Sequence, residues 1–211
     1  RRANEGAKKE GVTDRAHFVE QNLFETDLTP ATVITTYLLP EMNVKLRPKI
    51  LALKPGTRVV AHDYHMGDWR PDDNDTLSVP EKTVGNPGVS YIFMWYVPAN
   101  AAGKWQASIP VGGQTMAVDL DFSQRFQFLS GTARINEQTA QLQSGRLRGE
   151  EVTFWLATGS GQGMIRHEFN GKVAGDTITG TLRVHAGKKV DQVPFTAKRT
   201  AAGKVEVSAA P

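Results

Sequence analysis

Four side chains that could do chemistry follow one short β-branched segment, and they are His62, Asp63, His65 and Asp68. Imidazole nitrogens and carboxylate oxygens suit zinc or non-haem iron, and the same groups also serve as general bases. The two histidines are only three residues apart after a predicted strand, and no downstream motif completes a ligand set. We therefore expect no metal. A structural or substrate-side role is favoured, with His65 or Asp68 as the base if a substrate must lose a proton.

Two further patterns look like ligand loops but lack essential parts. Asp72, Asp73 and Asp75 resemble the start of a calcium loop, yet the glycine and the terminal glutamate are missing, so we expect a solvated loop. Residues 159–163 read Gly-Ser-Gly-Gln-Gly, which is the spacing of a cofactor loop. The next residues, 164–173, predict a strand where such a loop needs a helix, so we interpret 159–163 as a hairpin connection.

The composition narrows the class of protein. Of the 211 residues 39% are apolar and 22% are charged, which is enough to bury a core. There is no apolar run long enough to span a membrane. The net charge of +3 is spread along the chain, so nucleic acid is not expected as a partner. The absence of cysteine excludes disulfides and thiolate sites. Without a visible targeting segment the default compartment is the cytoplasm, an expectation that a segment preceding Arg1 would change.

The first hundred residues alternate between helix-like and strand-like segments, the order typical of a parallel sheet with crossover helices. The pattern predicts a helix at 1–10, strands at 17–20, 32–38 and 57–62, a helix at 43–53 that restarts at Pro48, a long loop at 70–88 and a strand at 91–97.

After about residue 102 the apolar period changes to two, and two similar segments around Gly149 and Gly175 each predict a strand, a Gly-acid turn and a strand. This pattern predicts an antiparallel sheet or small barrel. The expected fold class is therefore α/β plus all-β, with an α/β domain over 1–101 and a β-module over 102–211. Trp155, Arg166 and His167 could line a pocket in the β-module, although core or solvated positions are the default.

Four segments, in the right order, resemble class I S-adenosylmethionine-dependent methyltransferases, and the last of them is similar to a bacterial branch of such enzymes. They are Phe-Val-Glu-Gln-Asn-Leu-Phe-Glu-Thr-Asp-Leu at 18–28, the strand and exit loop at 31–43, Leu-Lys-Pro-Gly-Thr-Arg-Val-Val at 53–60 and His-Asp-Tyr-His-Met-Gly-Asp-Trp at 62–69. The resemblance covers about residues 1–105. It implies a partial Rossmann-like sheet whose first strands are absent, S-adenosylmethionine as cofactor, and methyl transfer to an acceptor that is a protein or a small molecule.

The family's glycine-rich loop and the acidic residue that ends its second strand have no counterpart here, because they would precede Arg1. That loop lets the backbone approach the cofactor, and the acid binds the ribose. We therefore expect the chain to be a fragment that is inactive by itself.

The resemblance also implies roles for individual residues. Asn22 and Leu23 would contact the adenine, although Asn22 has an alternative role as a loop cap. Tyr37 and Leu38 would bind the cofactor at the end of the following strand, where the alternative is that the leucines only seal the sheet. Tyr37 and Glu41, together with His65 and Asp68, would act on the methyl group or its acceptor.

Two other functions stay open. The β-module could be a barrel that carries a small apolar ligand, attached to an α/β part without catalysis. A closed apolar cavity would favour that function and a fully packed interior would exclude it. The β-module could also do no more than bury the open edge of the sheet.

Overall fold

The computed structural model describes residues 2–207, which form two compact units that divide after Pro30. In the first unit, helix α1 (Arg2–Lys9) is the predicted helix. The predicted strand at 17–20 is wrong. Those residues are extended but pair with no strand in the described part of the unit, and Phe18 and Val19 are 49% and 73% exposed. A β-strand needs a neighbouring strand to form hydrogen bonds with its backbone groups, and the described part of this unit contains no such strand.

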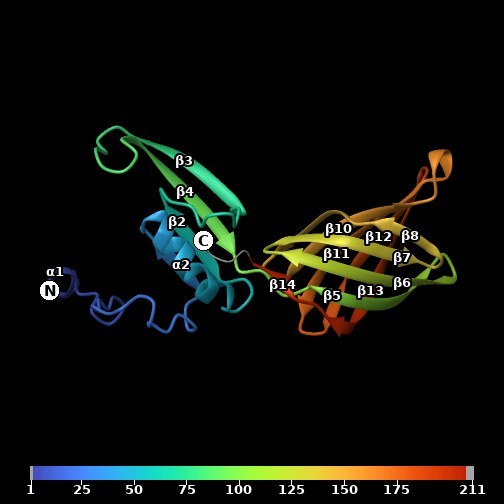
Figure 1. Cartoon of the computed structure of the whole chain (residues 1–211), viewed down its shortest axis with the longest axis horizontal. Helices are drawn as coiled ribbons and strands as arrows, with labels where there is room; N and C mark the ends of the chain where they lie inside the picture. Colours follow the sequence, from blue (N-terminus) through green and yellow to red (C-terminus); the bar gives the residue numbers. More distant parts are fainter. Residues whose placement is uncertain (1, 208–211) are drawn as a thin grey trace. The chain divides into compact units, whose positions relative to one another are not determined.

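The second unit begins with a four-stranded sheet in the order β1-β2-β4-β3 (Figure 1). Its strands are β1 (Val33–Thr36), β2 (Arg58–His62), β3 (Asp73–Val79) and β4 (Gly88–Tyr96). Strands β1 and β2 run parallel, with Val33 opposite Arg58 and Thr36 opposite Ala61. The carboxyl ends of these two strands therefore meet at one edge, as the sequence predicted. Strand β4 is antiparallel to both β2 and β3.

Helix α2 (Pro40–Leu51) connects β1 to β2 and corrects the predicted helix at 43–53. It starts three residues earlier, because Pro40 occupies the first turn, where proline's fixed φ and missing N–H are tolerated. It also continues through Pro48 without a restart. Leu46 and Ile50, which precede and follow the exposed Pro48 in the sequence, are both buried, and this burial on both sides of the proline favours a continuous helix.

Strand β3 lies inside the stretch that the sequence predicted to be a long loop. Six of its seven residues are exposed, so it carries no alternation of buried and exposed residues that a sequence could reveal. Its pairing with β4, from Asp73 opposite Met94 to Val79 opposite Gly88, makes it a strand. The loop between the two strands curls at the free end of this hairpin (Figure 1).

The remaining strands form a closed antiparallel barrel. Eight strands follow one another around it in the order β6-β5-β13-β12-β11-β10-β9-β7, and β7 pairs back with β6. Strands β8 and β14 are attached to β7 and β6. The bounds of these strands are β5 Gly103–Val111, β6 Gln114–Arg125, β7 Phe128–Ile135, β8 Gln138–Gln141, β9 Gln143–Arg148, β10 Glu151–Thr158, β11 Ile165–Ala174, β12 Thr177–Ala186, β13 Lys189–Ala202 and β14 Val205–Glu206.

The barrel confirms the predicted antiparallel β-module. Gly149 and Gly175 take positive φ values of 63° and 56° in the predicted tight turns. The glycine-rich residues 159–163 connect β10 to β11, with only the short 3₁₀ turn Gly161–Gly163 inside the connection. The chain passes from the four-stranded sheet to the barrel between Tyr96 and Gly103. A domain boundary between 101 and 102 stays a prediction.

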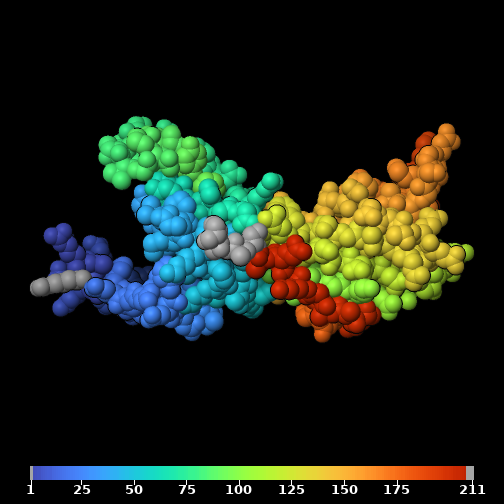
Figure 2. All heavy atoms as spheres, in the orientation of Figure 1, coloured from blue at the N-terminus to red at the C-terminus, as the bar shows by residue number. Residues whose placement is uncertain are grey.

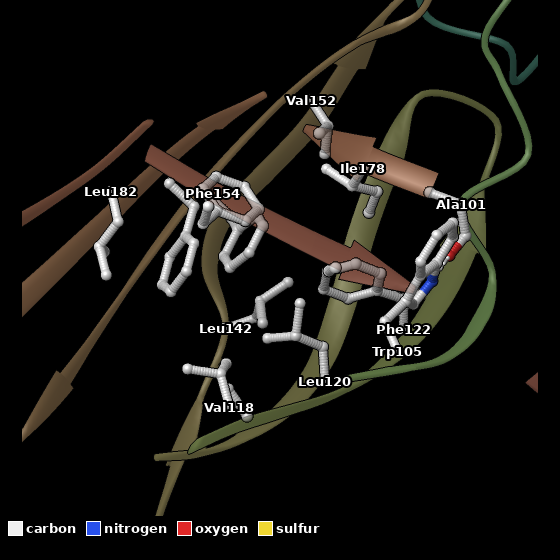
Figure 3. Close-up of a cluster of buried hydrophobic side chains, with 14 of the residues drawn as sticks. Ala101, Trp105, Val118, Leu120, Phe122, Leu142, Val152, Phe154, Ile178 and Leu182 are labelled. Atoms are coloured by element: carbon white, nitrogen blue, oxygen red, sulfur yellow. Dashed lines mark hydrogen bonds between the residues drawn. The ribbon is translucent and has the colours of Figure 1, made fainter. Parts of the chain in front are cut away.

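Aromatic rings fill the middle of the barrel (Figure 3). The Phe154 and Phe169 rings are stacked with centroids 4.6 Å apart, and Phe122 and Phe195 meet this pair edge-on at 5.2 and 5.3 Å. At one end Trp105 is fully buried and donates a hydrogen bond from Nε1 to the Ala101 carbonyl. That end of the barrel is therefore closed.

The sheet and the barrel are joined by buried polar contacts within the second unit. Trp69 Nε1 donates to Gln127 Oε1 at 3.1 Å, and the Asp72 carboxylate, 1% exposed, pairs with Arg146 at 2.9 Å. Figure 2 shows the tip of the β3–β4 hairpin standing clear of this junction. No helix within residues 2–207 has the length and apolar character needed to cross a membrane.

Candidate functional site at the carboxyl edge of the parallel strands

Aromatic side chains gather where β1 and β2 end. Tyr37 directly follows β1 and His62 is the last residue of β2, and their rings stack with centroids 4.6 Å apart. Tyr64 lies 6.2 Å from Tyr37, ring to ring. Tyr37 is 56% exposed. In open α/β sheets, ligands bind beyond the carboxyl ends of the strands, and this edge offers them flat aromatic surfaces.

Asn43 holds the two loops of this edge together from α2. Its Nδ2 donates to the Leu38 carbonyl at 3.3 Å and to the Tyr64 carbonyl at 3.2 Å. Its Oδ1 is buried and has no hydrogen-bond partner among residues 2–207, and the same is true of Thr36 Oγ1. Buried oxygens without partners are rare in proteins and often mark places where a ligand or water binds.

Asp63 is a completely buried carboxylate beside these rings. It has a φ of 65°, which bulky residues rarely adopt. Its Oδ1 accepts a hydrogen bond from the Tyr91 N–H at 3.1 Å, and its Oδ2 forms an ion pair with Lys82. Burial alone would raise the pKa of Asp63. The hydrogen bonds from Lys82 and Tyr91 and the neighbouring positive charge outweigh burial and lower this pKa.

Lys82 carries the network from Asp63 to His62. Besides the ion pair, its Nζ donates to the Val89 carbonyl at 2.6 Å and to Ser90 Oγ at 3.1 Å, which uses all three ammonium hydrogens. Ser90 Oγ lies 2.9 Å from His62 Nε2. Because Ser90 accepts from the lysine, its own hydrogen is free to point at the imidazole. The curled β3–β4 loop thereby orients the ring on which Tyr37 stacks.

Sequence reasoning missed Lys82 and Ser90, because the first lies in the predicted loop and the second in an apolar stretch. Gly85 was the residue in the sequence that could have indicated this close approach of the loop. It has a φ of +77°, and a Cβ built on it would lie 3.1 Å from Asp63 Oδ2. A glycine is therefore required for the loop to lie this close to the carboxylate.

The predicted cofactor residues Asn22 and Leu23 lie in the first unit. The Asn22 side chain caps its own loop, because Oδ1 accepts from the Phe24 N–H at 3.0 Å and Nδ2 donates to Glu25 at 2.8 Å. Leu23 is half-buried. The loop-capping role considered for Asn22 is thus present, and its contact with a cofactor stays a prediction.

The structure places the other predicted residues around the edge in different settings. Leu38 is half-buried behind Tyr37, and Glu41 is exposed in the first turn of α2, where a carboxylate stabilises the helix N-terminus. The exposed His65 accepts the Gly67 N–H at Nδ1. Asp68 pairs with buried Arg47 at 2.5 Å and with Arg125 of β6 at 2.8 Å. The contacts of Asp68 therefore favour a role in joining sheet and barrel.

No group of three or more His, Cys, Asp or Glu side chains in the described part of the chain is arranged to hold a metal ion. His62 and His65 point their nitrogens at Ser90 and Gly67 instead. Of the three aspartates that resemble a calcium loop, Asp72 binds Arg146 and Asp73 binds Arg148. Arginine partners thus occupy carboxylates that a calcium ion would need.

Comparison with known proteins shows which proteins the start of the chain is similar to. Residues 1–73 match the family model of the ANTKMT methyltransferase domain. This match confirms the resemblance of the N-terminal part to S-adenosylmethionine-dependent methyltransferases, and it contains every site residue predicted from the sequence. Lys82 and Ser90 lie beyond the matched segment.

Two relatives are informative about the extent of the likeness. A protein-lysine N-methyltransferase of Saccharolobus islandicus is 46% identical over 74 residues, which are 35% of this chain and 46% of that protein. An RNA methyltransferase of Salinibacter ruber, solved with S-adenosyl-L-homocysteine, is 41% identical with a TM-score of 0.38, over 46% of this chain and 57% of that one. The chain spans about half the length of the relatives it matches.

The residues at the sheet edge fit part of S-adenosylmethionine, the cofactor that the family resemblance implies. An exposed tyrosine ring and the 52% exposed Leu39 suit an adenosine or methionine group, and aromatic faces attract a sulfonium cation. The unpartnered Thr36 Oγ1 and Asn43 Oδ1 lie in the same region. No glycine-rich loop that opens a helix occurs among residues 2–207 to hold the rest of the molecule.

Proposed function

We propose that the protein containing this chain transfers a methyl group from S-adenosylmethionine to the side-chain amine of a lysine in another protein. The observation that carries the proposal is the parallel pair β1–β2, which brings Tyr37 and His62 together at a carboxyl edge inside the matched methyltransferase segment. The identity to a protein-lysine N-methyltransferase supports lysine as the acceptor.

S-adenosylmethionine, when bound, supplies a methyl group that is already activated on a sulfonium. The protein's main task is then alignment, and orientation can contribute about 7–11 kcal/mol to a reaction of this kind. Tyr37 and Leu38 would hold the cofactor end nearest the sheet. Tyr37 and Tyr64 would present aromatic faces to the positive groups of donor and acceptor.

A lysine acceptor has to lose one proton before its nitrogen forms the new N–C bond. His65 is an exposed imidazole next to this edge, and it fits the role of a base better than Asp68, which is held by two arginines. His62 is fixed through Ser90 and Lys82, so it positions Tyr37.

Cofactor binding is tested by calorimetry of the natural full-length protein with S-adenosylmethionine and with S-adenosylhomocysteine. We expect one site per chain, and Tyr37→Ala to weaken binding by about tenfold. Val33→Ala, at the opposite end of β1 and 40% exposed, is the matched control and should bind like the unaltered protein. Absence of cofactor binding to the full-length protein would refute the proposed methyltransferase activity.

The acceptor is tested with labelled S-adenosylmethionine and one lysine-rich protein in two forms. The first form is untreated, and in the second every lysine has been acetylated chemically, which leaves an amide nitrogen that cannot accept a methyl group. Label should enter the untreated form only, on lysine as located by mass spectrometry. Equal labelling of both forms, or labelling of added RNA instead, would exclude a lysine acceptor.

A further inference from the structure

The barrel is closed at one end and hollow at the other. Beyond the stacked phenylalanines, near the β5–β6, β7–β8 and β10–β11 connections, side chains line an open cavity of about 670 Å³. Its walls include Met116, Ile135, Ile165 and Val184. The interior is thus neither fully packed nor sealed, and its open end forms a cup lined by aliphatic and neutral polar side chains. Its volume lies within the range of sites that hold small molecules.

His167 faces the cup from β11. It is 3% exposed and lies opposite Leu156 on one side and Val184 on the other. Its Nε2 is 3.0 Å from Thr158 Oγ1, but its Nδ1 is buried and has no hydrogen-bond partner among the described residues. Burial lowers the pKa of His167 to about 4, so the ring is neutral at pH 7.

A neutral imidazole has one N–H donor and one nitrogen acceptor. Whichever of these faces Thr158, the other is left without a partner, and an unsatisfied buried polar group costs about 1–3 kcal/mol. A ligand that reaches this nitrogen after a small movement of the cup wall would recover that energy. The barrel's other buried polar side chains show the contrast: Gln124 at the closed end bonds with Ala99, Ala101 and Phe126.

The lining of the cup restricts the ligand's charge. Among the described lining residues there is no lysine or arginine, and the charged side chain present is Glu137, exposed at the rim. A carboxylate or phosphate would find no counter-charge and would be repelled by the glutamate. The remaining polar groups, such as Gln114 and Gln138, are neutral.

We propose that the open end of the barrel binds one neutral, mainly apolar small molecule whose single hydrogen-bonding group is directed at His167. This site is separate from the sheet edge. Its occupancy does not depend on methyl transfer, and either proposal can fail without the other.

The test uses N-phenyl-1-naphthylamine, a neutral apolar fluorophore with one N–H, and the whole chain. We expect a saturable rise in fluorescence with one probe per chain. Met116→Trp and Val184→Phe fill the cup from two strands and should each weaken binding at least tenfold. Arg183→Phe places the same ring on the outer face of β12 and is the matched control, with unchanged affinity.

A second probe isolates the histidine. His167→Leu should weaken binding of the naphthylamine about threefold to tenfold and leave the binding of naphthalene, which has no hydrogen-bonding group, unchanged. If the cup-filling variants do not fold, amide NMR shifts of the unaltered chain decide the matter, since the probe should perturb Ile135, Ile165 and His167 and not Trp105. Unsaturable binding, equal binding to all variants, or shifts at the closed end would overturn the proposal.

Discussion

Polar side chains are arranged differently at the edge of the four-stranded sheet and in the interior of the barrel. At the sheet edge a carboxylate, an ammonium, a hydroxyl and an imidazole are linked in sequence through Asp63, Lys82, Ser90 and His62. The barrel core is a large cluster of apolar side chains, with His167 and Thr158 as a buried polar pair near the open end. A hydrogen-bond network fixes the orientation of its side chains, and a catalytic site at the sheet edge needs such fixed orientations. Burial of apolar side chains is the main stabilising contribution to such a core, and an unpaired nitrogen within it is costly.

The largest effect is expected from removing a buried side chain from the apolar core of the barrel. Phe169→Ala removes a fully buried ring from the aromatic stack and should lower the free energy of unfolding by about 3–5 kcal/mol. Asn170→Ala, the next residue and exposed, should cost less than about 0.5 kcal/mol. Urea denaturation followed by circular dichroism measures both. Similar losses for the two variants would show that the stack does not dominate the barrel's stability.

Removing the charge at the centre of the network should cost about 3 kcal/mol or slightly more. Asp63→Ala leaves the Lys82 ammonium, 11% exposed, without its buried partner. The double variant Asp63→Ala, Lys82→Met removes both charges and should recover much of the loss. A double-mutant cycle of unfolding free energies gives the coupling between the two residues. A coupling near zero would contradict the network.

The neutral histidine predicts a pH dependence of stability. The folded pKa of His167, about 4, lies below its unfolded value of 6.5, so between these values the unfolded chain binds a proton that the folded chain does not. Stability contributed by His167 is therefore complete above pH 6.5 and falls by about 3 kcal/mol as the pH approaches 4.

His167→Leu should flatten that part of the unfolding curve, as measured by urea titrations at several pH values. Asp63 acts in a lower window. Its folded pKa is below the ordinary aspartate value of 3.8, so its contribution is complete above pH 3.8 and is lost only as the pH falls further. An unchanged slope in the leucine variant would mean that His167 is not the titrating group.

The smallest stability effect is expected at Asp68. Asp68→Asn weakens its pairs with Arg47 and Arg125 and should cost about 1 kcal/mol, because the carboxylate is 38% exposed. Methyl transfer by the full-length protein should fall less than threefold, whereas His65→Asn should lower kcat more than tenfold. A hundredfold loss of kcat in Asp68→Asn at unchanged stability would instead make Asp68 the base.

Local patterns in the sequence determined much of the architecture. The β-branched runs before Tyr37 and His62 indicated two parallel strands, although β1 lies at the sheet edge and exposes every second residue, and the glycines at 149 and 175 marked hairpins of the barrel. These features depend on residues that are close together in the sequence. The spacing of apolar residues along a segment indicates which of its faces is buried. The methyltransferase resemblance followed from motifs of the same local kind.

Only the tertiary structure decided which distant polar groups meet. Strand β3 depends on its partner β4, and Lys82 reaches Asp63 across nineteen positions because a loop curls back. Likewise, the unpaired His167 is defined by closure of the barrel around it. Burial and pairing are properties of the folded path of the chain, since a side chain's partners are set by every element packed around it and not by its sequence neighbours.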